Sequence, residues 1–174
     1  MRYCWRVTKY DPNLRDRAGA FRGDEWIMVT EIGQTFGGER LTRELYLAME
    51  DRYVSAALHF LKESGLDSLK VKSLEQRPRV KSWGVPAEFA ALRHTVHVRD
   101  GEYLSGDSLQ SICRLNLRSL LWCKLEEAGQ FYLHFGWDYY MYLGAGKPLP
   151  ESESFARALG LFVEPMRSPY GEGA

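Results

Sequence analysis

Residues 121–145, LWCKLEEAGQFYLHFGWDYYMYLGA, decide the fold of this chain. Apolar and polar side chains alternate along this stretch with a period of two, which is typical of strands that bury one face. The segments EAGQ and GWD interrupt the alternation with residues that favour turns. The pattern therefore predicts an antiparallel meander of three strands, LLWCKLE, FYLHF and YYMYL.

Strand phase assigns the side chains of this meander to two faces, because directly opposite residues in antiparallel strands point the same way. We expect Leu125 to lie opposite Phe131 and Phe135 opposite Tyr139, with a three-residue turn at 136–138. One face then carries the core side chains Leu121, Cys123, Leu125, Phe131, Leu133, Phe135, Tyr139, Met141 and Leu143.

The opposite face collects rings with a polar end or a polar neighbour. We call it the aromatic face, and it is expected to carry the row Trp122, His134 and Tyr140 and the row Lys124, Tyr132 and Tyr142. Such side chains suit a surface that is wet at one time and covered at another. Two interpretations stay open: another segment covers this face, or the face contacts a partner. The candidate binding residues are Trp122, Tyr132, His134, Trp137, Asp138, Tyr140 and Tyr142.

Residues 42–64 have the clearest helical period in the chain. Thr42 is a suitable N-cap, and Gly65 can end the helix in a left-handed conformation. The residues expected to face the core are Tyr46, Met49, Tyr53, Ala56, Ala57, Phe60 and Leu61. The residues expected to face water are Glu50, Asp51, Ser55, His59, Lys62 and Glu63.

The other segments complete the expected fold. We expect strands at 2–10, 68–74 (an edge strand, from its lysines) and 161–165, helices at about 105–118 and 151–159, and an irregular loop at 11–25. The fold class is therefore α+β, with an antiparallel sheet of five or six strands, a C-terminal meander, one long amphipathic helix and one or two shorter helices packed on it. Residues 1–164 are expected to form a single domain, with 165–174 as a flexible tail.

Composition narrows the class of protein. Hydrophobic residues make up 45% of the chain and charged residues 26%, and no apolar run approaches the roughly 20 residues that cross a bilayer. We expect a soluble cytoplasmic protein. Cys4, Cys113 and Cys123 lie in apolar segments, which suggests free thiols. The formal net charge of zero gives no overall attraction for polyanions.

No stretch carries a motif that defines a reaction. GAGKP at 144–148 lacks the first glycine of a phosphate loop and has Pro148 where Ser or Thr would bind magnesium. The four histidines lack zinc-site spacing to the cysteines, so we expect no metal and no cofactor. His134 is the candidate acid or base of an enzyme, oriented by Asp138 or by Glu25.

Basic residues concentrate in one segment, which contains Lys70, Lys72, Arg77, Arg79 and Lys81. Together with stacking on the aromatic face, this patch would suit a single-stranded nucleic acid. A run of charge is more often a solvated face, and the zero net charge weakens this alternative.

The segments YCWRVTKYDP, WCKLE, FGWDYYMY and GLFVEP, with the closing SPY, resemble a family of small bacterial cytosolic proteins. The resemblance spans nearly the whole chain and implies a bacterial source and a single α+β domain, but no particular reaction. We expect a protein-recognition module, for example an immunity protein or an adaptor, whose partner is another protein bound through the aromatic face. The alternatives are single-stranded nucleic-acid binding and a small hydrolase-like enzyme centred on His134.

Overall fold

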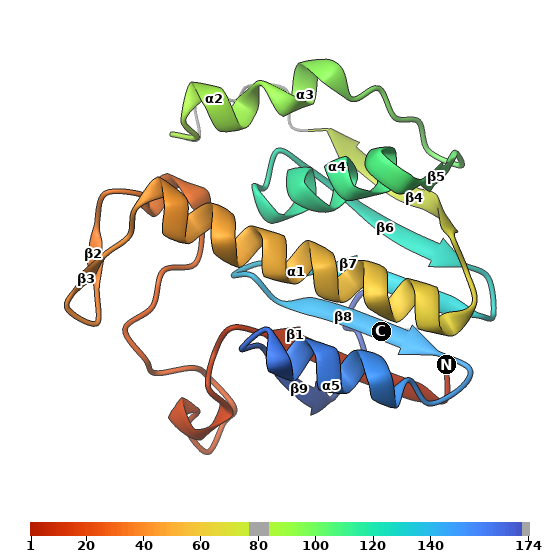
Figure 1. The fold of residues 1–174 in the computed structure, drawn as a ribbon, viewed down its shortest axis with the longest axis horizontal. Helices are drawn as coiled ribbons and strands as arrows, with labels where there is room; N and C mark the ends of the chain where they lie inside the picture. The colour runs from red at the N-terminus through yellow and green to blue at the C-terminus, as the bar shows by residue number, and fades with distance from the viewer. Residues whose placement is uncertain (77–83, 172–174) are drawn as a thin grey trace.

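The computed structural model describes residues 1–76 and 84–171 of the 174-residue chain. A seven-stranded antiparallel sheet carries its main helices on one face (Figure 1). The strand order is β5-β4-β6-β7-β8-β1-β9. The α+β class is confirmed, and the sheet has one strand more than the upper expectation. Within the described ranges, no helix is long and apolar enough to cross a membrane.

The helices and strands predicted from sequence occur in the predicted order. The strands of the sheet are β1 (Tyr3–Thr8), β4 (Ser68–Gln76), β5 (Tyr103–Ser105), β6 (Leu121–Glu127), β7 (Phe131–Phe135), β8 (Met141–Ala145) and β9 (Phe162–Pro165). The helices are α1 (Arg43–Ser64), α4 (Gly106–Leu117) and α5 (Pro150–Ala158), with single turns at α2 (Ala87–Ala90) and α3 (Leu92–Thr95). A small ribbon, β2 (Thr35–Phe36) and β3 (Glu39–Arg40), and two 3₁₀ turns, Pro12–Leu14 and Val29–Glu31, precede α1.

The meander forms as predicted, but its register differs by two residues at each pairing. Leu125 lies opposite Leu133, and Phe135 lies opposite Met141. An even shift leaves every side chain on its predicted face, because the side-chain period of a strand is two. At the β7–β8 pairing the physical reason is that Tyr139 leaves the ladder, so the turn spans 136–140 instead of 136–138. At the β6–β7 pairing the ladder ends with Glu127 opposite Phe131, so the turn takes up residues 128–130.

The predicted edge strand at 68–74 belongs to β4, which lies inside the sheet. β6 pairs with it on one side, and β5 pairs with it on the other through contacts such as Leu69 opposite Leu104. The sequence of β5 is only three residues long and was not expected to be a strand. The short strands β5 and β9 are therefore the edges of the sheet, which limits exposed backbone at both sides.

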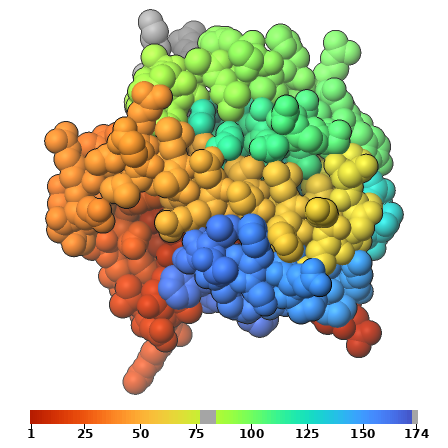
Figure 2. Space-filling view, in the orientation of Figure 1, coloured from red at the N-terminus to blue at the C-terminus, as the bar shows by residue number. Residues whose placement is uncertain are grey.

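Helix α1 forms the centre of the core, and its predicted ends are confirmed. The Thr42 hydroxyl oxygen accepts a hydrogen bond from the Leu45 amide at 3.3 Å, and Gly65 closes the helix with a φ of 93°. The space-filling view shows α1 between α4 and α5 (Figure 2). The expected core side chains of α1 are buried except Met49, which is half-buried. Cys113 and Cys123 are buried free thiols, and Cys4 is a half-buried one.

Glu50 corrects the expectation that one face of α1 sees water. Its side chain is 0% exposed, and both its oxygens accept hydrogen bonds from Arg118 at 2.7 Å. Arg114 adds a third contact at 3.0 Å, and Arg118 also donates to the Phe89 carbonyl. α4 therefore covers this part of α1. On the other flank α5 covers Glu63, which accepts from the Ser152 amide at 2.7 Å.

We expect Glu50→Ala to lower the free energy of unfolding by about 3–5 kcal/mol, because it leaves the Arg118 guanidinium buried without its carboxylate. Asp51→Ala is the matched control, since Asp51 meets Arg114 at the surface with its side chain 60% exposed, and such pairs contribute less than about 1 kcal/mol. Urea unfolding of the two variants measures the difference. Equal losses would show that the buried pair has no special weight.

Candidate functional site

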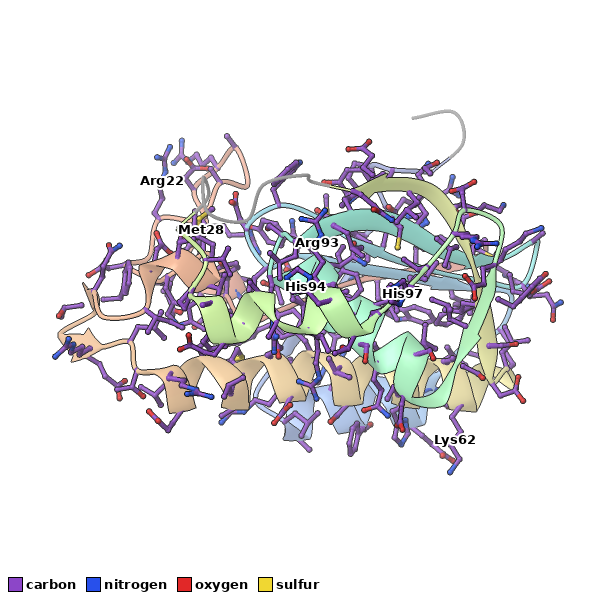
Figure 3. The ribbon with its side chains drawn as sticks, turned by 90° about the horizontal axis from the view of Figure 1, so that it is seen from above. Arg22, Met28, Lys62, Arg93, His94 and His97 are labelled. Atoms are coloured by element: carbon purple, nitrogen blue, oxygen red, sulfur yellow. The ribbon has the colours of Figure 1, made fainter. Side chains whose placement is uncertain are left out.

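The aromatic face lies on the side of the sheet opposite the helices, as strand phase predicts. Leu133 and Met141 are fully buried in the core, whereas their neighbours in sequence His134 and Tyr142 point to the other face. The cross-strand row is Lys124, His134 and Tyr142, which corrects the predicted row of Trp122, His134 and Tyr140. Seen from above, Lys62 on α1 lies on the helix side of the molecule, and Arg22 in the 11–25 loop lies on the opposite side (Figure 3).

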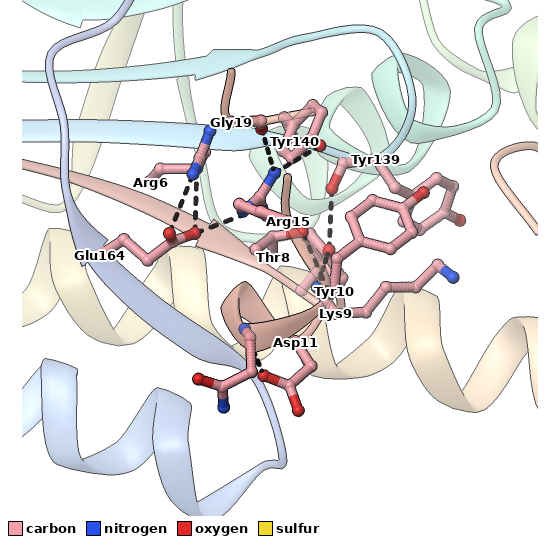
Figure 4. Close-up of polar contacts among 12 residues, drawn as sticks. Arg6, Thr8, Lys9, Tyr10, Asp11, Arg15, Gly19, Tyr139, Tyr140 and Glu164 are labelled. Atoms are coloured by element: carbon pink, nitrogen blue, oxygen red, sulfur yellow. Dashed lines mark hydrogen bonds and ion pairs between the residues drawn. The ribbon is translucent and has the colours of Figure 1, made fainter. Parts of the chain in front are cut away.

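Two segments cover most of the aromatic face. The tail after β9 places Tyr170 edge-on against Trp122, with ring centroids 5.4 Å apart, and against Tyr142 at 6.1 Å. The 11–25 loop inserts Arg15, which donates to the Tyr140 hydroxyl at 3.1 Å and pairs with Glu164 at 3.3 Å (Figure 4). The first of the two open interpretations, a covered face, therefore holds for these residues. Residues 172–174 of the predicted flexible tail lie outside the described residues.

Exposure divides the seven predicted binding residues into three groups. His134 and Tyr142 are buried, at 1% and 6% exposed. Trp122, Tyr132 and Tyr140 are half-buried. Only Trp137, at 53%, and Asp138 are exposed, and both lie in the β7–β8 turn. A partner can therefore reach the turn directly, while the rest of the face is occupied by the chain itself.

His134 joins a carboxylate to a hydroxyl. Its Nε2 lies 2.8 Å from Glu126 Oε1, and its Nδ1 lies 2.8 Å from Ser168 Oγ. Tyr132 stacks on the imidazole at 4.7 Å between ring centroids. Lys72 pairs with the second oxygen of Glu126 at 2.8 Å. We call this arrangement the Glu126–His134–Ser168 chain.

Burial and hydrogen bonds set the protonation states of Glu126 and His134. Burial opposes ionisation of Glu126, but the hydrogen bonds from Lys72 and His134 outweigh it and hold the pKa of this carboxyl below its usual range. Burial also lowers the pKa of His134 despite the attraction of Glu126. The imidazole is therefore neutral at pH 7, with its Nε2 proton donated to the Glu126 carboxylate and its Nδ1 free to accept from Ser168.

Neither acid predicted to orient His134 does so. Asp138 lies in the turn, and Glu25 pairs with Lys9 at 2.5 Å. With the true register Glu126 is a diagonal neighbour of His134, within reach of a long side chain. The predicted register placed Glu126 too far from His134 for contact. The correct length of the β6–β7 turn would have identified Glu126 as the partner of His134. Ser168 gives no sequence signal, because only the docked tail brings it here.

A hollow of ≈ 580 Å³ opens beside the Glu126–His134–Ser168 chain. All three residues line it, together with Cys4, Tyr132 and Arg167. No group of three or more His, Cys, Asp or Glu side chains among the described residues is arranged to hold a metal ion. The hollow can therefore admit a small molecule next to a neutral imidazole and a hydroxyl.

The predicted nucleic-acid patch is only partly described. Lys72 is paired with Glu126, and Lys70 lies 5.7 Å from the centroid of the Tyr103 ring. Arg77, Arg79 and Lys81 lie outside the described residues. Nucleic-acid binding by these five residues stays a prediction.

The β7–β8 turn is held from both faces of the sheet. Tyr139 is 3% exposed and packs its ring edge-on against Trp26, Tyr46 and Tyr53. The Tyr53 hydroxyl donates to the Tyr139 carbonyl at 2.8 Å and accepts from the Lys9 amide at 2.6 Å. On the other face the Trp137 amide hydrogen-bonds Tyr170.

This packing imposes an unusual backbone on the turn. Asp138 and Tyr139 both have left-handed φ angles, 62° and 61°, which cost energy for residues other than glycine. Asp tolerates this conformation, whereas Tyr139 adopts it because its ring is fixed in the core. The turn is therefore a rigid support that points Trp137 outward.

Comparison with protein-family models, with curated proteins and with solved structures finds no match.

We expect Tyr53→Phe to lower the free energy of unfolding by about 2–4 kcal/mol, because it leaves the Lys9 amide and the Tyr139 carbonyl buried without partners. Tyr103→Phe, at a ring that is 54% exposed, is the control and should change stability by less than about 0.5 kcal/mol. Thermal or urea unfolding measures both. A neutral Tyr53→Phe would show that this hydroxyl does not support the turn.

The lowered pKa of His134 makes stability depend on pH between 7 and 5. The unfolded histidine, with a pKa of about 6.5, binds a proton before the folded one does, so the free energy of unfolding falls as the pH drops through this window. His134→Gln should remove this fall, and His97→Gln, at an exposed position, should keep it. Urea unfolding at several pH values tests the sign. A wild type more stable at pH 5 than at pH 7 would contradict it.

Proposed function

We propose that this chain is a protein-recognition module of a bacterial cytoplasm, of the immunity or adaptor type, which contacts its partner through the β7–β8 turn. The observation that carries the proposal is the exposed Trp137 on a strained turn that is fixed from both faces of the sheet. Tryptophan is enriched among the residues that dominate binding energy at interfaces. A rigid support lowers the entropy lost when such a side chain is buried by a partner.

The strain supports this function better than a purely structural role. A tight hairpin could join β7 and β8 with glycine at the left-handed positions, whereas this chain has Asp138 and Tyr139 there. Backbone strain of this kind persists only where surrounding contacts hold it, and it concentrates at functional sites. The contacts of Tyr139 and Tyr170 supply that support while leaving the indole of Trp137 half in solvent.

The proposed binding surface is narrower than the aromatic face expected from sequence. The tail and the 11–25 loop occupy Tyr142, Tyr140 and Trp122, so these residues support the surface rather than form it. The exposed Asp138 adds a negative charge beside the indole. A matching partner would offer an apolar pocket for the indole with a basic side chain at its rim.

The test uses the products of the genes next to this one, because an immunity protein is encoded beside its toxin. Each neighbour is co-expressed with the wild type, and the neighbour whose toxicity is suppressed is purified for calorimetry. Trp137→Ala should weaken its binding at least about 30-fold, the effect of losing an anchor worth about 2 kcal/mol, and should abolish protection.

Tyr103→Ala is the matched control, since this ring is as exposed as Trp137 but lies on the edge strand β5. It should leave binding and protection unchanged. Far-UV circular dichroism and thermal unfolding establish that both variants are folded. Protection by a folded Trp137→Ala variant equal to that by the wild type would remove the turn as the binding site.

A further inference from the structure

The Glu126–His134–Ser168 chain has the connectivity that activates a serine hydroxyl. Two contacts of 2.8 Å link the carboxylate to one imidazole nitrogen and the hydroxyl to the other. A nucleophile within hydrogen-bond reach of a base, with the base oriented by a third group, is the arrangement expected for covalent acyl transfer. The carboxylate meets Nε2 and the serine meets Nδ1, the reverse of the order in trypsin-like proteases, but either nitrogen can take the proton.

The hydrogen-bond directions leave the Ser168 proton for His134. The Tyr170 amide donates to Ser168 Oγ at 3.1 Å, so this contact uses the oxygen as an acceptor. His134 gives its own proton to Glu126, so Nδ1 can accept from the hydroxyl. Ser168 is therefore positioned to lose its proton to the imidazole when the oxygen attacks.

A second serine–histidine contact, elsewhere in the protein, shows which features distinguish a nucleophile from a structural serine. Ser152 Oγ lies 2.9 Å from His59 Nδ1, but its hydroxyl donates to the Glu63 carboxylate at 2.5 Å. Ser152 is also 0% exposed and lies within the first turn of α5, where its amide donates to Glu63. The proton of Ser152 is thus bound to an acid, and its oxygen is closed to solvent. Ser168 differs on both points: its proton is left for His134, and its side chain lines the hollow.

The hollow provides space for an acyl group. Ser168 and His134 line its wall, and Lys72 and Arg167 line it as well. Lys72 is paired with Glu126, so Arg167 supplies the positive charge in this lining that favours the negative oxygen formed when a carbonyl carbon is attacked. The hollow of ≈ 580 Å³ falls within the range of small-molecule sites.

We infer that Ser168 is a nucleophile for acyl transfer from small activated esters, with His134 as its base and Glu126 as the residue that positions the imidazole. Ser168 Oγ bonds to the carbonyl carbon, and its proton moves to His134 Nδ1. The ester C–O bond breaks, and the leaving alkoxide takes that proton. Water then attacks the acyl-serine through the same base, which returns the carboxylic acid and the free hydroxyl.

A fluorophosphonate probe tests the nucleophile directly. Ser168 Oγ displaces fluoride from phosphorus, and the serine proton leaves through His134, so a labelled protein gains the mass of the probe less hydrogen fluoride. Intact mass and peptide mapping should place the adduct on Ser168 and none on Ser152. Ser168→Ala should abolish labelling. His134→Gln should slow it about 100-fold, the usual contribution of a general base.

His59→Gln is the matched control, because it removes the histidine of the other serine contact and should label at the wild-type rate. p-Nitrophenyl acetate provides a second readout, in which wild type releases p-nitrophenolate faster than Ser168→Ala. Circular dichroism and thermal unfolding verify that each variant is folded. Folded wild type without an adduct on Ser168, or folded His134→Gln labelled as fast as wild type, would overturn the inference.

The pH profile of labelling separates the role of Glu126 from simple support of the fold. Labelling should rise with pH as His134 loses its proton. Glu126 on β6 favours the protonated imidazole, whereas Lys124 on β6 and Lys72 on β4 oppose it. Glu126→Gln should therefore move the midpoint of the profile to lower pH as well as slow the reaction. An unmoved midpoint in folded Glu126→Gln would exclude the positioning role.

Discussion

The alternation of side chains along β6, β7 and β8 is the constraint on which the rest of the structure depends. It sends aliphatic and phenyl side chains toward α1 and sends Trp122, His134 and Tyr142 to the opposite face. Each face must then be covered in a different way. Helices cover the apolar side, while the other side needs partners that can hydrogen-bond, which Arg15, Ser168 and Tyr170 provide. Both proposed sites depend on this division.

Local patterns predicted the elements well, because period, caps and turn residues act within a few positions of each other. Thr42, Gly65 and the stripe on α1 are such cases. The register was wrong because a period of two cannot detect a shift of two, and the length of the β7–β8 turn depends on where Tyr139 finds its core site. Glu50 was placed in water because its partner Arg118 lies 68 positions away. The site was half predictable: His134 was recognised, whereas Ser168 needed the tail.

One tail serves both proposed sites at the two ends of β7. Tyr170 supports the turn that carries Trp137, and Ser168 lies two residues earlier, against His134. The sequence SPYG thus links the hollow near the β6–β7 turn to the β7–β8 turn at the far end. A ligand that orders or displaces this tail at the hollow would change the support of Trp137 as well. Recognition and chemistry would be coupled through a few residues of backbone.

The position of β1 in the sheet has a consequence for folding during synthesis on the ribosome. β1 lies between β8 and β9, with Trp5 opposite both Leu143 and Pro165, so this strand has no backbone partner in the sheet until β8 has been synthesised. Most of the chain must be synthesised before this part of the sheet can close, and contacts this distant in sequence form slowly. Until then the apolar side of β1 is exposed, and exposed apolar strands favour misassembly with other unfolded chains.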